Sequence, residues 1–200
     1  MTTFADLRAL TIELTKRPEL VALTESAIRT ATLRAHHTDF FRRDLAQGVL
    51  NYTVVADAYF YNFPNLTDLL PRLRTMKNVY GVTTQGHQIE QLEYRESDDL
   101  YDSDGNYRRY VYTLIGDTLR VYPDIPTGII HVYHFTNPDV STGGYSSWIA
   151  NVYPDDLAGW AAAIVMARTG FLELAKHYQD AYVKPLQEQL IASHLLATVS

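Results

Sequence analysis

The chain has 200 residues, of which 46% are hydrophobic and 20% charged, and its formal net charge is -6 at pH 7. These values fit one folded globular domain and argue against a disordered chain. The negative charge argues against a surface that holds nucleic-acid phosphates, and the absence of cysteine excludes disulfides and thiolate zinc sites. No apolar stretch approaches the roughly 20 residues of a membrane span, and residues 1–8 lack the apolar core of a signal peptide. We therefore expect a soluble protein, made in a cytosol, with no membrane partner.

Helices are predicted in the first quarter of the chain. Apolar residues recur at helical spacing over residues 4–14, and Thr3 and Asp6 stand where a capping box needs them. A second amphipathic pattern follows and ends near His37. Gly48 is expected to close this helical region.

The centre of the chain favours strands. Between residues 51 and 153 the sequence is rich in β-branched and aromatic residues, and 13 of the 15 tyrosines lie there. Gly116-Asp117 predicts a tight hairpin turn. The candidate strands are residues 52–56, 91–95, 107–115, 118–122 and 128–135.

The last quarter returns to a helical pattern. Pro154 and the two acids after it form a helix start signal, Gly170 marks a possible break, and Pro185 should kink or stop the helix. The apolar face of this pattern includes Phe171 and Leu172. We predict an α+β fold, in which terminal helices pack as a small bundle with a central antiparallel β insert and a C-terminal tail. The single domain would comprise helical residues 1–48 and 154–185, a β-rich insert at 49–153 and a tail at 186–200.

The acidic loop at residues 98–104 allows two interpretations. An EF-hand calcium loop would begin at Asp102, but Tyr107 and Thr113 then stand where the motif needs glycine and glutamate. A solvated turn is the better interpretation. Asp98, Asp99 and Asp104 would then be exposed turn residues.

Other candidate chemistry is equally weak. Ser146 and Ser147 lack the glycine that follows a nucleophile elbow, and the seven histidines show no metal-ligand spacing. The run from Phe40 to Arg43 could contact nucleic acid, but an anchor with buried rings and solvated arginines is the commoner use of such a segment. We predict no catalytic residue, no metal and no cofactor, and hence no enzyme.

Several motifs together resemble a known family. They are RPELV at residues 17–21, ATLRAHH at 31–37, DFF at 39–41, GDTLRVYP at 116–123, IIHVYHF at 129–135, YSSWIANVYPDDL at 145–157 and the alanine-rich segment at 161–170. Their order resembles that of the head-to-tail adaptor (connector) proteins of tailed bacteriophages, including the tail tubular protein A type.

This resemblance implies a structural virion protein at the head–tail junction, assembled in the host cytoplasm. Copies of the chain would form a ring, commonly of twelve, that binds the portal protein, contacts a tail or nozzle protein and passes genomic DNA without binding it specifically. The expected portal-binding residues are Leu186, Leu190, Ile191, Leu195 and Leu196. The expected inter-subunit or tail contacts are Tyr101, Tyr110, Tyr112, Tyr145 and Trp148, because tyrosine and tryptophan are enriched at protein interfaces.

Two alternatives stay open from the sequence. The chain could be another virion part, such as a tail-completion or tail-terminator subunit. It could also be a phage hydrolase whose two catalytic carboxylates follow no sequence pattern, since only their distance in space defines such a pair.

Overall fold

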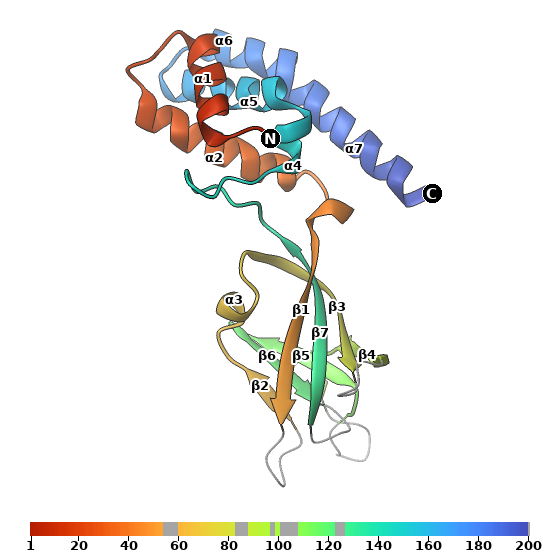
Figure 1. The fold of residues 1–200 in the computed structure, drawn as a ribbon. Coiled ribbons are helices and arrows are strands. Elements are labelled where there is room, and N and C mark those ends of the chain that lie inside the picture. Colours follow the sequence, from red (N-terminus) through yellow and green to blue (C-terminus); the bar gives the residue numbers. More distant parts are fainter. Residues whose placement is uncertain (54–59, 83–87, 97–98, 101–107, 123–126, 200) are drawn as a thin grey trace. The chain divides into compact units, whose positions relative to one another are not determined.

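The computed structural model describes residues 1–53, 60–82, 88–96, 99–100, 108–122 and 127–199 (Figure 1). The chain divides into two compact units, each with its own hydrophobic core. The helical unit comprises Met1–Asp44 and Asn137–Ser200, and the sheet unit comprises Leu45–Thr136.

Two helices open the helical unit, α1 (Phe4–Thr15) and α2 (Val21–His36). The predicted capping box of α1 is confirmed: the Asp6 amide donates to Thr3 Oγ1 at 3.2 Å, and the Thr3 amide donates to Asp6 Oδ2 at 2.8 Å. These two bonds satisfy amides that no helical carbonyl could reach. Local sequence therefore fixes where α1 begins.

The chain returns to the helical unit through α4 (Trp148–Val152) and α5 (Pro154–Arg168). Pro154 occupies the first turn of α5, as predicted. The predicted break at Gly170 is also confirmed, because this glycine adopts a φ of 84°. The Phe171 amide donates to the Met166 carbonyl at 3.0 Å, which closes α5 with a Schellman motif.

After this turn the chain continues as one helical run. It consists of α6 (Leu172–Tyr178), the π-helical turn η2 (Gln179–Val183) and α7 (Lys184–Val199). Helix α5 supplies the centre of the core, and both α1 and α2 pack against it. The core side chains of the helical unit include Phe4, Leu7, Ile28, Ile149, Leu157, Trp160, Val165, Leu186 and Leu190.

Among the described residues, the sheet unit contains seven strands in the order β1-β7-β3-β4-β5-β6-β2. Their bounds are β1 Leu45–Thr53, β2 Tyr61–Phe63, β3 Leu73–Val82, β4 Gln88–Tyr94, β5 Val111–Ile115, β6 Thr118–Tyr122 and β7 Thr127–Thr136. A short helix, α3 (Leu66–Leu69), follows β2, and the 3₁₀ turn η1 (Arg42–Asp44) precedes β1. The predicted turn at Gly116-Asp117 joins β5 and β6, with Gly116 at a φ of 59°.

The predicted fold class is wrong in three respects. The sheet is mixed rather than antiparallel, because β4 and β5 run parallel with Glu93 opposite Val111. It is a seven-stranded unit with its own core rather than an insert in a small bundle. Finally, the expected C-terminal tail is a 16-residue helix, α7, whose first half is part of the helical core.

Gly48 does not close a helical region. It lies within β1, opposite Val132, and a Cβ atom there would stand 2.1 Å from Leu70 Cδ2. Glycine therefore allows the Leu70 side chain, which follows α3, to pack directly on the backbone of β1.

The sequence pattern also missed β2 and β3. Strand β3 pairs with β7 through two register shifts, between Leu73 and Thr75 and between Met76 and Asn78. Each shift breaks the alternation by which a strand is recognised in a sequence. Strand β5 begins at Val111 rather than at residue 107, since Tyr110 adopts a φ of 57°.

Candidate assembly surfaces

Helix α6 exposes large apolar side chains. Phe171, Leu172 and Leu174 are 47%, 66% and 47% exposed, and Ala175 is the buried residue of this helix. We call the first three residues the α6 patch. Arg17 covers one side of it, with its guanidinium carbon 5.6 Å from the Phe171 ring centroid. Three large exposed apolar side chains within four residues are more than the isolated surface apolar residue that needs no explanation.

Two of these residues were part of a predicted apolar helix face. Phe171 and Leu172 belong to the apolar face predicted for the last helical segment, and the structure exposes both side chains. A signal was available, because Leu172 and Leu174 stand two residues apart and so point about 200° apart around a helix. Both cannot pack against the same partner, α5.

Helix α7 carries the five residues expected to bind a portal. Leu186 and Leu190 are fully buried in the core of the helical unit, whereas Ile191 is 44% exposed. Leu195 and Leu196 lie further along the same helix, and their side chains are outside the described residues. Portal binding stays a prediction, and among the described side chains Ile191 is the one that faces outward.

A π-helical turn lets the helical run pass through Pro185. Proline has no amide hydrogen, and its ring collides with the carbonyl four residues earlier in a regular helix. Here the Lys184 amide donates to the carbonyl of Gln179, five residues earlier, so the turn before Pro185 is widened. Of the two outcomes predicted for Pro185, a kink or a stop, the stop does not occur, and the helix is locally distorted by the π-helical turn instead.

The same turn packs tightly on neighbouring helices. A Cβ atom on Gly159 would lie 2.2 Å from Tyr182 Cγ, so the tyrosine ring rests directly on the backbone of α5. The Tyr178 hydroxyl donates to the Leu14 carbonyl of α1 at 2.7 Å. These contacts pack the middle of the helical run against α1 and α5.

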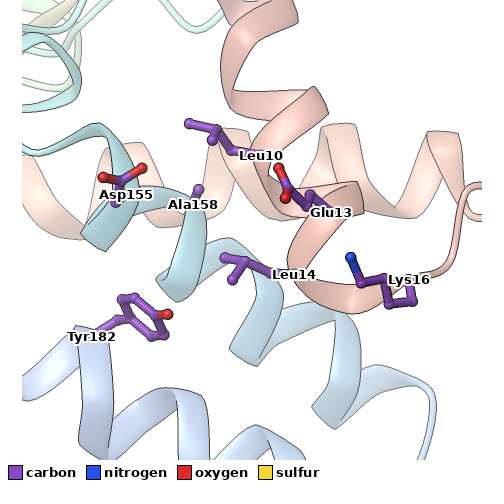
Figure 2. A pocket seen from close by; sticks show the side chains of 7 residues that line it. All are labelled: Leu10, Glu13, Leu14, Lys16, Asp155, Ala158 and Tyr182. Atoms are coloured by element: carbon purple, nitrogen blue, oxygen red, sulfur yellow. The ribbon is translucent and has the colours of Figure 1, made fainter.

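A cavity of about 420 Å³ lies beside Tyr182 (Figure 2). Asp155 and Tyr182 stand at one end of the view, Lys16 at the other, and leucine side chains from α1 lie between them. The lining of the cavity therefore combines two carboxylates and an ammonium group with apolar side chains. The lining residues are Leu10, Glu13, Leu14, Lys16, Asp155, Ala158 and Tyr182.

A second, smaller cavity lies in the sheet unit. It measures about 240 Å³ and is lined by Leu45, Lys77, Asn78, Tyr80 and Tyr133. Tyr80 and Tyr133 meet edge to face with ring centroids 5.5 Å apart, and the Asn78 amide donates to the Tyr80 hydroxyl at 3.1 Å. Rigid tyrosines beside polar groups are typical of protein interfaces.

A buried network in the helical unit has the geometry of a catalytic triad. His36 Nδ1 lies 3.0 Å from the Asp44 carboxylate, and His36 Nε2 lies 2.9 Å from Ser147 Oγ. Ser147 Oγ also accepts the Ala150 amide and caps α4, while the Trp148 indole donates to Asp44 at 2.9 Å. The three triad-like residues are at most 5% exposed, and neither cavity is lined by them.

This network is better explained by structure than by catalysis. Every polar atom in it has a partner inside the protein, which is what burial of such groups requires. The bonds tie the end of α2 to η1 and to the start of α4. Tyr145 lies next to this network, and its hydroxyl forms a hydrogen bond of 2.8 Å with the Thr32 hydroxyl. Burial raises the pKa of the Tyr145 hydroxyl, although its hydrogen bonds to Thr32 and Ser147 act in the opposite direction.

The residues expected at inter-subunit or tail contacts are spread over both units. Tyr112 is buried in the sheet core, and Tyr110, Tyr145 and Trp148 are half-buried. Tyr101 lies outside the described residues. The contact role of these residues stays a prediction. Tyr80 and Tyr133, which sequence reasoning did not single out, are the tyrosines that line the cavity of the sheet unit.

The aromatic–basic segment after α2 is divided between core and surface. Phe41 is 3% exposed and Phe40 is 51% exposed, so one of the two rings serves as the expected anchor. Arg43 stacks on Trp148, with its guanidinium carbon 5.0 Å from the ring centroid.

Of the acidic loop, the structure describes Asp99, which pairs with Arg95 at 2.7 Å and with Arg108 at 3.5 Å. Asp98, Asp102 and Asp104 lie outside the described residues. Within the part of the chain that the structure describes, no three potential ligands gather as a metal site would require. In the same part, no helix combines the length and the apolar character needed to cross a lipid bilayer.

Comparison with known proteins identifies the family. The family model described as "SU10 adaptor protein" matches residues 2–195, nearly the whole chain. The chain belongs to the SU10 adaptor protein family. It is therefore a phage adaptor protein and a virion component, as the resemblance of its motifs predicted. A search of curated proteins found no match for the adaptor.

Proposed function

We propose that this adaptor forms a ring of identical copies that joins the portal of a phage head to the tail and extends the channel for DNA. The family match over residues 2–195 is the observation that carries this proposal. Its partners would be further copies of itself, commonly twelve to a ring, the portal protein and a tail or nozzle protein. Its place would be the head–tail junction, reached by assembly in the host cytoplasm.

The surface of the helical unit supports a function based on contacts. The α6 patch leaves apolar area in water, where a protein partner could cover it and stabilise an assembly. The polar rim of the cavity in Figure 2 offers a second contact to a side chain. We propose accordingly that the adaptor acts by binding and makes or breaks no covalent bond.

The charge of the chain supports a passage for DNA rather than a grip on it. A net charge of -6 gives weak attraction to phosphates, so a genome could slide past without being held. Twelve copies would multiply this charge in a ring.

The test is to mix the purified adaptor with portal rings of the same phage and to follow both by sedimentation and electron microscopy. We expect the adaptor to sediment with the portal and to add a layer beneath it. An adaptor that stays apart from intact portal rings at micromolar concentration would contradict the proposal. Bovine serum albumin of matched concentration controls for trapping in the pellet.

A further inference from the structure

The chain crosses between its two units twice, and both crossings are bound by the end of α2. The outward crossing leaves the helical unit at Asp44, directly before β1, and the return crossing enters it at Asn137, directly after β7. Two adjacent histidines, His36 and His37, stand at the end of α2, and each forms a hydrogen bond to one of these residues. All four residues belong to the helical unit.

His36 binds the outward crossing. Its Nδ1 atom lies 3.0 Å from each oxygen of the Asp44 carboxylate, and both side chains are buried. The carboxylate accepts this hydrogen bond, and the His36 Nδ1–H group donates it. The Trp148 indole of α4 donates to the same carboxylate at 2.9 Å. Donors from α2 and α4 therefore fix the last side chain before β1.

His37 binds the return crossing. Its Nε2 atom lies 2.7 Å from Asn137 Oδ1, at the surface of the helical unit. An amide oxygen only accepts, so the His37 Nε2–H group is the donor. A histidine that takes up a second proton donates through both ring nitrogens, so neither hydrogen bond depends on the charge of its imidazole. Neighbouring residues of one helix therefore hold the two crossings.

Further side chains of α2 hold the segment that follows Asn137. Positions 29, 32 and 36 of α2 are spaced by three and four residues, which places them along one side of the helix. Each forms a hydrogen bond with the segment at residues 140–147. The pairs are Arg29 with Val140 and Thr142, Thr32 with Tyr145, and His36 with Ser147. The return crossing thus leads into a segment that is fastened to α2.

The two crossings are also joined within the sheet unit. Strands β1 and β7 pair from the crossings onward, with Leu45 opposite Phe135. Each crossing is a short stretch of backbone that can turn about φ and ψ. A side-chain hydrogen bond to the residue beside the crossing removes part of that freedom. Because adjacent histidines bind both crossings, the two are restricted together.

We propose that His36 and His37 form a clamp that fixes the directions in which the chain leaves and re-enters the helical unit. The clamp restricts the motion of the sheet unit relative to the helical unit in a single copy. This inference goes beyond the proposed ring, because it concerns the free chain. A symmetric ring requires that every copy present the same surfaces to its neighbours, and the clamp serves that requirement.

The test is a distance distribution between two spin labels, measured by pulsed electron paramagnetic resonance on the free chain, which has no cysteine of its own. The labels are attached to Leu172→Cys in the helical unit and Leu114→Cys in the sheet unit, at positions 66% and 40% exposed. We expect His37→Ala to broaden the distribution roughly 1.5-fold, because the return crossing regains rotation about φ and ψ. Arg34→Ala, at an exposed position of α2 outside the clamp, is the control and should leave the width unchanged.

Substitutions of Asp44 extend the test to the outward crossing. Asp44→Asn keeps an oxygen that can accept from His36, so the distribution should stay narrow. Asp44→Ala removes the acceptor and should broaden the distribution. Thermal unfolding of each variant shows whether it is folded at the temperature of labelling.

His37→Ala decides the inference by itself, because it removes one exposed hydrogen bond and should leave the fold intact. A folded His37→Ala variant with an unchanged width would overturn the clamp, and so would equal broadening in Arg34→Ala. The portal takes no part in this measurement. An adaptor that fails to bind portal rings would therefore contradict the ring proposal alone.

Discussion

Helices α5 and α6 are neighbours in the chain, yet they meet different surroundings. Helix α5 buries most of its residues, among them Leu157, Trp160 and Val165. Helix α6 buries Ala175 and leaves the three side chains of the α6 patch in water. The Schellman turn at Gly170 separates the two.

The difference shows that an apolar helix face has two possible uses. In α5 the apolar residues hold the helical unit together, and in α6 they are exposed to water. Under the proposed function, the exposed residues of α6 would contribute free energy to binding a partner. Substitutions in the two helices should therefore separate stability from assembly.

The largest effect is expected from emptying the core around α5. Leu157→Ala removes a side chain that is 1% exposed and should lower the free energy of unfolding by about 2–5 kcal/mol. Leu172→Ala, the same substitution at a side chain 66% exposed, should change it by less than about 0.5 kcal/mol. Urea unfolding of both variants measures the contrast. Equal losses would show that α6 is packed as firmly as α5.

A smaller effect is expected where α5 touches the π-helical turn. Gly159→Ala places a methyl group 2.2 Å from Tyr182 Cγ and should cost about 1–3 kcal/mol through overpacking. Gly143→Ala, with nothing within 4 Å of its Cβ, is the matched control. Combining Gly159→Ala with Tyr182→Ala should recover part of the loss, and a fully additive double variant would argue against the contact.

The buried network before α5 should show a loss of similar or lesser size. Ser147→Ala removes the cap of α4 and leaves His36 Nε2 without that partner, which should cost about 1–2 kcal/mol. Ser146→Ala, the exposed neighbour, should be nearly neutral. Thermal unfolding of the two variants measures the difference in their loss of stability. A stable Ser147→Ala variant would remove the structural explanation of the network.

The smallest effect is expected at the start of α1, where two local hydrogen bonds between Thr3 and Asp6 cap the first turn. Hydrogen bonds from the Thr3 backbone and then from its side chain lower the pKa of Asp6 below its ordinary value of 3.8. A lowered folded-state pKa gives stability that is present above the unfolded pKa and is lost as pH falls through the folded one. The free energy of unfolding should therefore decrease as the pH is lowered from 6 to 2. In Asp6→Asn the free energy of unfolding should depend less strongly on pH over this range. An unchanged pH dependence would contradict the stabilising role of the cap.

Elements with local signals could be predicted from the sequence. The capping box of Thr3 and Asp6, the proline start of α5 and the Gly116 turn each depend on residues within a few positions. Strand β3 could not be predicted, because two register shifts against β7 disturb its alternation. The parallel pairing of β4 with β5 is set by contacts far apart in the chain, which no local pattern records.

The candidate surfaces were harder to predict than the family. The motif order identified the adaptor family, but burial decides which apolar residues face outward. Leu186, Leu190 and Ile191 are all large aliphatic residues of α7. Leu186 and Leu190 are nevertheless buried, whereas Ile191 is exposed. Leu172 and Leu174 could have been recognised, because a helix cannot bury both against one neighbour.

Labelling of Leu172→Cys tests most directly whether the α6 patch is an assembly surface. A maleimide dye would be added to the free adaptor and, in parallel, to the adaptor bound to portal rings. We predict rapid labelling of the free chain, as expected for a position 66% exposed, and labelling at least tenfold slower in the ring. Equal rates in the two states would contradict the claim that assembly covers this patch.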